Sequence, residues 1–94
     1  MIKDRKRIRQ TIEEKIMKDN PYELLNGKTC FKTMSDGYVR LDTIGDDYNC
    51  IVIEFAENKR EAKNNRFEDG DLLDVGEFSL EEIEKIVRQQ IIDN

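Results

Sequence analysis

The segment spanning residues 66–77, RFEDGDLLDVGE, carries five acidic residues around one Asp-Gly pair. They are Glu68, Asp69, Asp71, Asp74 and Glu77. Carboxylates at this density suit a calcium loop, acid–base catalysis or a surface that binds a basic partner. If Gly70 were the sixth residue of an EF-hand loop, Phe67 would stand at position three and Gly76 at position twelve, where the loop needs oxygen ligands. Because two ligands are missing, the spacing favours a solvated turn at Asp69-Gly70 over a calcium site.

The sequence offers little material for catalysis. It contains no histidine, so neither a Ser-His nor a Cys-His pair can form, and its glycines are too dispersed to make a phosphate loop. Glu57-Asn58-Lys59 matches the acid-x-Lys unit of metal-dependent nucleases in letters only, because it follows a predicted strand; we interpret it as a charged helix start. Cys50 is interpreted as a core thiol and Cys30 as a part-buried one. The sequence therefore predicts a non-enzymatic protein without a cofactor or metal site.

The net charge of −5 conceals a strong segregation of charge along the chain. Residues 1–10 hold five basic residues and one acidic residue, whereas residues 67–84 hold eight acidic residues and no basic one. Such blocks suit either a surface for a partner or pairing between segments of the same chain. Both interpretations stay open at this point.

The density of carboxylates favours binding to a protein. Carboxylates imitate phosphates and accelerate encounter with a basic surface, such as the active cleft of a nuclease. Small immunity proteins that neutralise toxins and small phage-encoded inhibitors of host defence commonly have this general character. The comparison is by general type and not by a shared sequence motif. The sequence therefore predicts an inhibitor or immunity-type protein that covers a basic surface of a partner protein. The predicted contact residues are Glu68, Asp69, Asp71, Asp74 and Glu77, with Asp46 and Asp47 as a second patch.

Two alternatives remain. The basic segment KDRKRIR could contact nucleic-acid phosphates. Its residues are Lys3, Arg5, Lys6, Arg7 and Arg9. The acidic remainder of the chain, with an isoelectric point near 4.8, argues against nucleic acid, as does the lack of a recognition motif. The second alternative is a divalent-ion loop at residues 69–74 in an intracellular domain of another function.

Apolar periodicity predicts a helix near each end of the chain. Ile8, Ile12 and Ile16 recur at helical spacing and predict a helix over roughly residues 4–18, before Pro21. Near the C-terminus, Ser79-Leu80-Glu81-Glu82 is a capping box that predicts a helix running nearly to residue 94. Residues 56–66 predict a short exposed helix, with a long loop as the alternative.

Strands are predicted between the helices. Alternation in residues 28–34 and 38–44 around Ser35-Asp36-Gly37 predicts a hairpin, and Asn26-Gly27 predicts a turn before it. The consecutive β-branched residues of the segment 48–55 predict a strand buried on both faces. A short fourth strand is predicted around Leu72 to Val75.

Together these elements predict a small two-layer α+β domain, in which an antiparallel sheet of three to four strands carries the N- and C-terminal helices on one face. We expect residues 1–94 to form one domain, with fraying at residues 1–6 because their cations oppose the helix dipole. No segment is long and apolar enough to span a bilayer or serve as a signal peptide, so we expect a cytoplasmic protein. A homodimer would add buried area that such a small core lacks.

Overall fold

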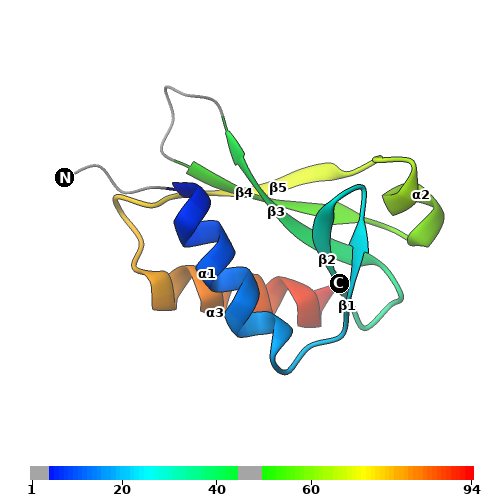
Figure 1. Cartoon of the computed structure of the whole chain (residues 1–94), viewed down its shortest axis with the longest axis horizontal. Helices are drawn as coiled ribbons and strands as arrows, with labels where there is room; N and C mark the ends of the chain where they lie inside the picture. The colour runs from blue at the N-terminus through cyan, green and yellow to red at the C-terminus, as the bar shows by residue number, and fades with distance from the viewer. Residues whose placement is uncertain (1–4, 45–49) are drawn as a thin grey trace.

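The structure is a computed structural model that describes residues 5–44 and 50–94 (Figure 1). Its elements are α1 (Arg5–Met17), β1 (Tyr22–Leu25), β2 (Lys28–Lys32), β3 (Tyr38–Ile44), β4 (Cys50–Ala56), α2 (Lys59–Lys63), β5 (Glu68–Asp74) and α3 (Leu80–Asp93). The described strands form one antiparallel sheet in the order β1-β2-β3-β4-β5, and α1 and α3 lie against one face of it (Figure 1). The predicted α+β class and helix placement are confirmed, with five strands instead of three to four.

The additional strand is β1, which pairs with β2 through a two-residue turn. Asn26 and Gly27 have φ angles of 55° and 74°, the double positive φ that a type I′ hairpin turn requires. Tyr22 consequently pairs with Phe31, and Leu25 with Lys28. The Asn-Gly turn was predicted, but the residues before it do not alternate in polarity, so the strand that they form was missed.

The main core lies between the sheet and the helices α1 and α3. The apolar stripes predicted for both helices are confirmed, because Ile12, Ile16, Ile83 and Val87 are all fully buried. These helix residues pack on Phe31, Val39, Leu41, Ile51, Ile53 and Leu73 from the sheet. Ion pairs join α3 to α1 and to the residues that follow α1: Lys15 of α1 lies 3.8 Å from Glu84, and Asp19 lies 2.8 Å from Arg88.

A second, smaller cluster lies on the opposite face of the sheet. It comprises Leu25, Cys30, Tyr38, Ala56 and Ala62, with Phe67 packed against it. Ala62 belongs to α2, so this short helix and the residues after it cover one end of the face that α1 and α3 leave open. Strand β4 is therefore buried on both faces, as predicted, with Ile51, Val52 and Ile53 all inaccessible or nearly so.

The two cysteines are placed the other way round from the prediction. Cys30 is fully buried in the second cluster, whereas Cys50 is partly exposed because it is the first residue of β4. Burial raises the pKa of the Cys30 thiol above its ordinary value. The buried Cys30 thiol therefore lacks the lowered pKa that makes a cysteine a reactive nucleophile.

The C-terminal helix begins as predicted. The Ser79 hydroxyl accepts a hydrogen bond from the Glu82 amide at 3.1 Å, and the Glu82 carboxylate accepts one from the Ser79 amide at 3.0 Å. This capping box holds the pKa of Glu82 below its ordinary value, because the Ser79 amide stabilises the charged carboxylate.

Within the described ranges, no helix is long and apolar enough to cross a membrane.

Candidate functional site

The five predicted contact residues of segment 66–77 lie on β5 and in the turn after it. We call them the acidic edge: Glu68, Asp69, Asp71, Asp74 and Glu77. Strand β5 pairs with β4 on one side only, so it forms an outer edge of the sheet. All of the acidic edge except the half-buried Asp74 is exposed to solvent. The structure therefore brings the predicted residues together along one free strand and into the turn that follows.

The Asp-Gly pair at the centre of this segment lies in a β-bulge. Val52 pairs with Leu72 and Glu54 with Asp69, so two residues of β5, Gly70 and Asp71, stand opposite the single residue Ile53. A Cβ atom on Gly70 would lie 3.0 Å from the carbonyl oxygen of Ile53, so the close approach of the two backbones favours glycine here.

Two predictions about this segment are corrected as a result. The predicted solvated turn at Asp69-Gly70 is wrong, and the strand begins at Glu68 instead of near Leu72. Asp and Gly favour turns in isolation, but β4 offers this segment a ladder of backbone hydrogen bonds, and Gly70 accommodates the irregularity within that ladder.

The bulge spreads the carboxylates over both sides of the edge. Asp69 stands directly opposite Glu54, so both point to the face of the sheet away from α1 and α3. Asp71 instead accepts a hydrogen bond from the side-chain amide of Gln90 on α3, at 3.2 Å. Leu72, which follows, is 57% exposed and is the apolar residue in the middle of these acids.

One member of the acidic edge builds the turn between β5 and α3. The Asp74 carboxylate accepts a hydrogen bond from the Gly76 amide at 2.7 Å, and its carbonyl accepts from the amides of Glu77 and Phe78 at 3.0 Å. By contrast, the side chains of Glu68, Asp69 and Glu77 make no hydrogen bond or ion pair with any residue in ranges 5–44 and 50–94. These three carboxylates contribute charge to the surface without a partner among the described residues.

The acidic edge does not form a metal centre in the described parts of the chain. Residues 69–74, predicted in one alternative as a divalent-ion loop, form an extended strand, and a strand rises by about 3.3 Å per residue. Accordingly, no three acidic, cysteine or histidine side chains among residues 5–44 and 50–94 converge as metal ligands.

The other predicted contact residues are placed only in part. Asp46, Asp47 and Lys3 lie outside the described residues, and the side chains of Arg5 and Lys6 do as well. Arg7 is exposed on α1, whereas Arg9 is half-buried, and its Nε atom is buried with no hydrogen-bond partner in the described chain. Burial raises the pKa of nearby Glu13, although the charges of Arg9 and Lys28 oppose that rise.

Next to the start of β5 lies a buried polar cluster that the sequence did not reveal. Arg40 Nε donates to Glu54 Oε1 at 2.8 Å, and Arg40 Nη1 donates to Asn65 Oδ1, also at 2.8 Å. The Arg40 guanidinium carbon lies 3.7 Å from the centre of the Phe67 ring. These contacts fix the segment after α2 on the sheet and thereby fix where Glu68 and β5 begin. A partial signal was present, since β4 was predicted to be buried on both faces and Glu54 within it would then need a partner, but Arg40 alternates with Val39 and Leu41 and so falls on the polar side of its strand.

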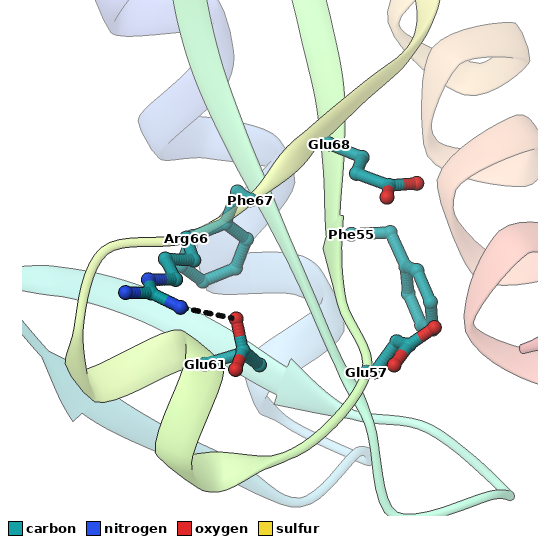
Figure 2. A pocket seen from close by; sticks show the side chains of 6 residues that line it. All are labelled: Phe55, Glu57, Glu61, Arg66, Phe67 and Glu68. Atoms are coloured by element: carbon teal, nitrogen blue, oxygen red, sulfur yellow. Dashed lines mark ion pairs between the residues drawn. The ribbon is translucent and has the colours of Figure 1, made fainter.

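A pocket of about 420 Å³ lies between α2 and the ends of β4 and β5 (Figure 2). We call it the α2 pocket, and it is lined by Phe55, Glu57, Glu61, Arg66, Phe67 and Glu68. In Figure 2, Phe67, Arg66 and Glu61 line one side of it, while Phe55, Glu57 and Glu68 line the other. Arg66 forms a long ion pair with Glu61, at 4.0 Å. The pocket is thus acidic, bordered by two aromatic rings and contiguous with the acidic edge through Glu68.

The helix beside this pocket is short and capped at its first turn. The Asn58 side chain accepts a hydrogen bond from the Glu61 backbone amide at 2.9 Å, and this caps the helical turn that carries Glu61. The ammonium of Lys59 donates to Glu23 of β1 at 2.8 Å. The interpretation of Glu57-Asn58-Lys59 as a charged helix start is confirmed, and the helix favoured for residues 56–66 is present over Lys59–Lys63.

Compared with models of protein families, with curated protein sequences and with solved structures, the chain matches none. The function is therefore argued from the acidic edge and its surroundings.

Proposed function

We propose that this chain is a non-enzymatic protein that binds a basic surface of a partner protein through the acidic edge, as an inhibitor of the immunity or phage anti-defence type does. One observation carries the proposal: Glu68, Asp69 and Glu77 are exposed beside a free edge strand and have no partner within the described residues. These carboxylates place negative charge along the edge without a pairing cation among the described residues, and such a surface attracts a cationic partner surface.

The form of the edge favours recognition by side chains over addition of a further strand. Exposed edge strands pair readily with other chains unless charges or bulges interrupt them, and β5 has both. Leu72 supplies an apolar contact among the acids, and partly apolar centres ringed by charge are typical of protein interfaces. A second copy of this chain would bring like charges together at this edge, so any homodimer would use another surface.

We place this encounter in the cytoplasm. Cys30 and Cys50 are both free thiols, a state that fits a reducing compartment better than an oxidising one.

The experiment compares two doubly substituted variants of equal charge. Asp69→Lys/Glu77→Lys reverses two carboxylates of the acidic edge and leaves the α2 pocket unaltered, whereas Glu14→Lys/Asp93→Lys reverses two exposed carboxylates on helices α1 and α3. The partner is first captured from an extract of the native host, identified by mass spectrometry and purified. Its affinity for each variant is then measured by titration calorimetry.

The edge variant should bind about 10- to 100-fold more weakly than the wild type, since like charges now face each other in the interface. The helix variant should bind nearly as well as the wild type. Equal losses in both variants would show that only the net charge matters, and the assignment to the acidic edge would be wrong.

A further inference from the structure

The α2 pocket has the charge and the aromatic lining that a guanidinium group requires. Its six lining residues include three glutamates and one arginine, and the arginine is already associated with Glu61. Glu57 and Glu68 are both exposed, and neither has an ion pair within ranges 5–44 and 50–94. The unbalanced charge at the pocket is therefore negative and is available to a cation from outside.

A guanidinium from within the same chain already lies over the ring of Phe67. Arg40 lies 3.7 Å from its centre, held there by its bonds to Glu54 and Asn65. The Phe67 ring at the border of the pocket is thus held in place before any partner arrives, and Phe55 lines the other side of the pocket from the face of the sheet that carries α1 and α3 (Figure 2). Aromatic rings attract cations, and the planar, weakly hydrated guanidinium stacks on them better than an ammonium does.

We propose that the α2 pocket receives an arginine side chain from the partner protein, with Glu57 and Glu68 as the carboxylates that pair with its guanidinium and the rings of Phe55 and Phe67 beside it. This inference rests on the proposed function, because it assigns the arginine to the basic surface that the acidic edge covers. Glu68 belongs to both the pocket and the acidic edge, so one docking event fills the pocket and covers the edge. The pocket supplies the shape selectivity that scattered surface charges lack.

The first test uses the full chain and a defined probe, N-acetyl-arginine amide, titrated while the amide and aromatic signals are followed by NMR. The ring signals of Phe55 and Phe67 and the amide signals of Glu57 and Glu68 should shift in a saturable manner. N-acetyl-lysine amide should bind more weakly at the same positions. Shifts that do not saturate, or that are equal for the two probes, would contradict an arginine pocket.

Two substitutions in the lining should act in opposite directions. Glu57→Gln removes a carboxylate that would face the guanidinium and should weaken probe binding by about threefold, the effect of one partly screened charge. Arg66→Gln removes the competing cation and should strengthen binding by a similar factor. Glu14→Gln makes the same change as Glu57→Gln on α1 and should have no effect. If Glu57→Gln strengthened binding and Arg66→Gln weakened it, the pocket would be an anion site and the inference would be wrong.

A final measurement separates this inference from the proposed function. Glu57→Gln lies outside the acidic edge, so its effect on the affinity of the purified partner tests the pocket alone. A loss of about threefold or more supports the arginine pocket. If Asp69→Lys/Glu77→Lys weakens partner binding while Glu57→Gln leaves it unchanged, the acidic edge is supported and the pocket inference is overturned.

Discussion

Glu54 and Asp69 face each other across strands β4 and β5, yet their environments differ in almost every respect. Glu54 is 9% exposed and accepts a 2.8 Å hydrogen bond from Arg40. Asp69 is exposed and has no side-chain partner in the described part of the chain. The Glu54 carboxylate is thus neutralised by a cation inside the fold, whereas the Asp69 carboxylate has no such partner in the described part of the chain.

The opposite edge of the sheet shows the same contrast. There, Glu23 of β1 accepts hydrogen bonds from Lys59 at 2.8 Å and from the Tyr38 hydroxyl, and Lys32 lies 4.0 Å away. Lys59, followed by Tyr38, holds the pKa of Glu23 below its ordinary value. Burial, followed by the bond to Glu23, raises the pKa of Tyr38 to about 12. The carboxylate at the β1 edge is thus bound internally, whereas the side chains of Glu68, Asp69 and Glu77 in the acidic edge have no partner in the described part of the chain.

The largest effect is expected where a carboxylate is buried. Arg40→Met should lower the free energy of unfolding by about 3–5 kcal/mol, because it leaves Glu54 buried without its cation. The double variant Arg40→Met/Glu54→Leu should regain most of the loss, since it removes both charges. Urea denaturation monitored by circular dichroism measures both. A loss below about 1 kcal/mol in the single variant would contradict the contrast between Glu54 and Asp69.

An intermediate effect is expected at Asp42, which is half-buried and accepts a 2.6 Å hydrogen bond from Lys28. Burial raises the pKa of Asp42, but the bonds from Lys28 and the Thr43 amide outweigh burial and hold that pKa below its ordinary value. Lys28→Met should destabilise the fold at neutral pH by about 1 kcal/mol or less, because solvent screens this half-exposed pair.

The pH dependence follows from the lowered pKa of Asp42. The stabilisation by the Lys28 pair is complete above the unfolded pKa of about 4 and is lost as the pH falls through the lower folded pKa. The difference in stability between wild type and Lys28→Met should therefore be constant at neutral pH and disappear in acid. Thermal melts across this pH range check it, and a difference that grows in acid would contradict the sign.

The smallest effect on stability is expected at the acidic edge itself. Asp69→Asn/Glu77→Gln should change the free energy of unfolding by less than about 0.5 kcal/mol, because no internal bond is lost. The same urea denaturation provides the measurement. A loss above about 1 kcal/mol would show that these carboxylates serve the fold.

Local patterns predicted much of this fold. The capping box at Ser79 and the apolar stripes of α1 and α3 were predicted correctly because helix starts and helical periodicity depend on nearby residues. Strand β3 was predicted to its exact ends because the hairpin turn before it is encoded locally. Strand β1 was missed because its pairing with β2, and not its own pattern, makes it a strand.

The candidate site was less predictable because its features depend on contacts between distant segments. The acids of β5 were identified, but the bulge at Gly70 exists only against the backbone of β4. Likewise, the cluster around Arg40 joins β3, β4 and the residues after α2, and the α2 pocket is formed beside it. Sequence patterns reveal charge and periodicity. Contacts between residues that are far apart in the sequence are seen only in the folded chain.

The most direct test of the central claim is the salt dependence of partner affinity for the wild type, the edge variant Asp69→Lys/Glu77→Lys and the helix variant Glu14→Lys/Asp93→Lys. If the acidic edge binds a basic surface, wild-type affinity falls steeply as salt rises, because salt screens attraction between the two surfaces. The helix variant should retain this steep dependence, and the edge variant should lose most of it. A salt dependence that is equally steep in the edge variant and the wild type would contradict the account.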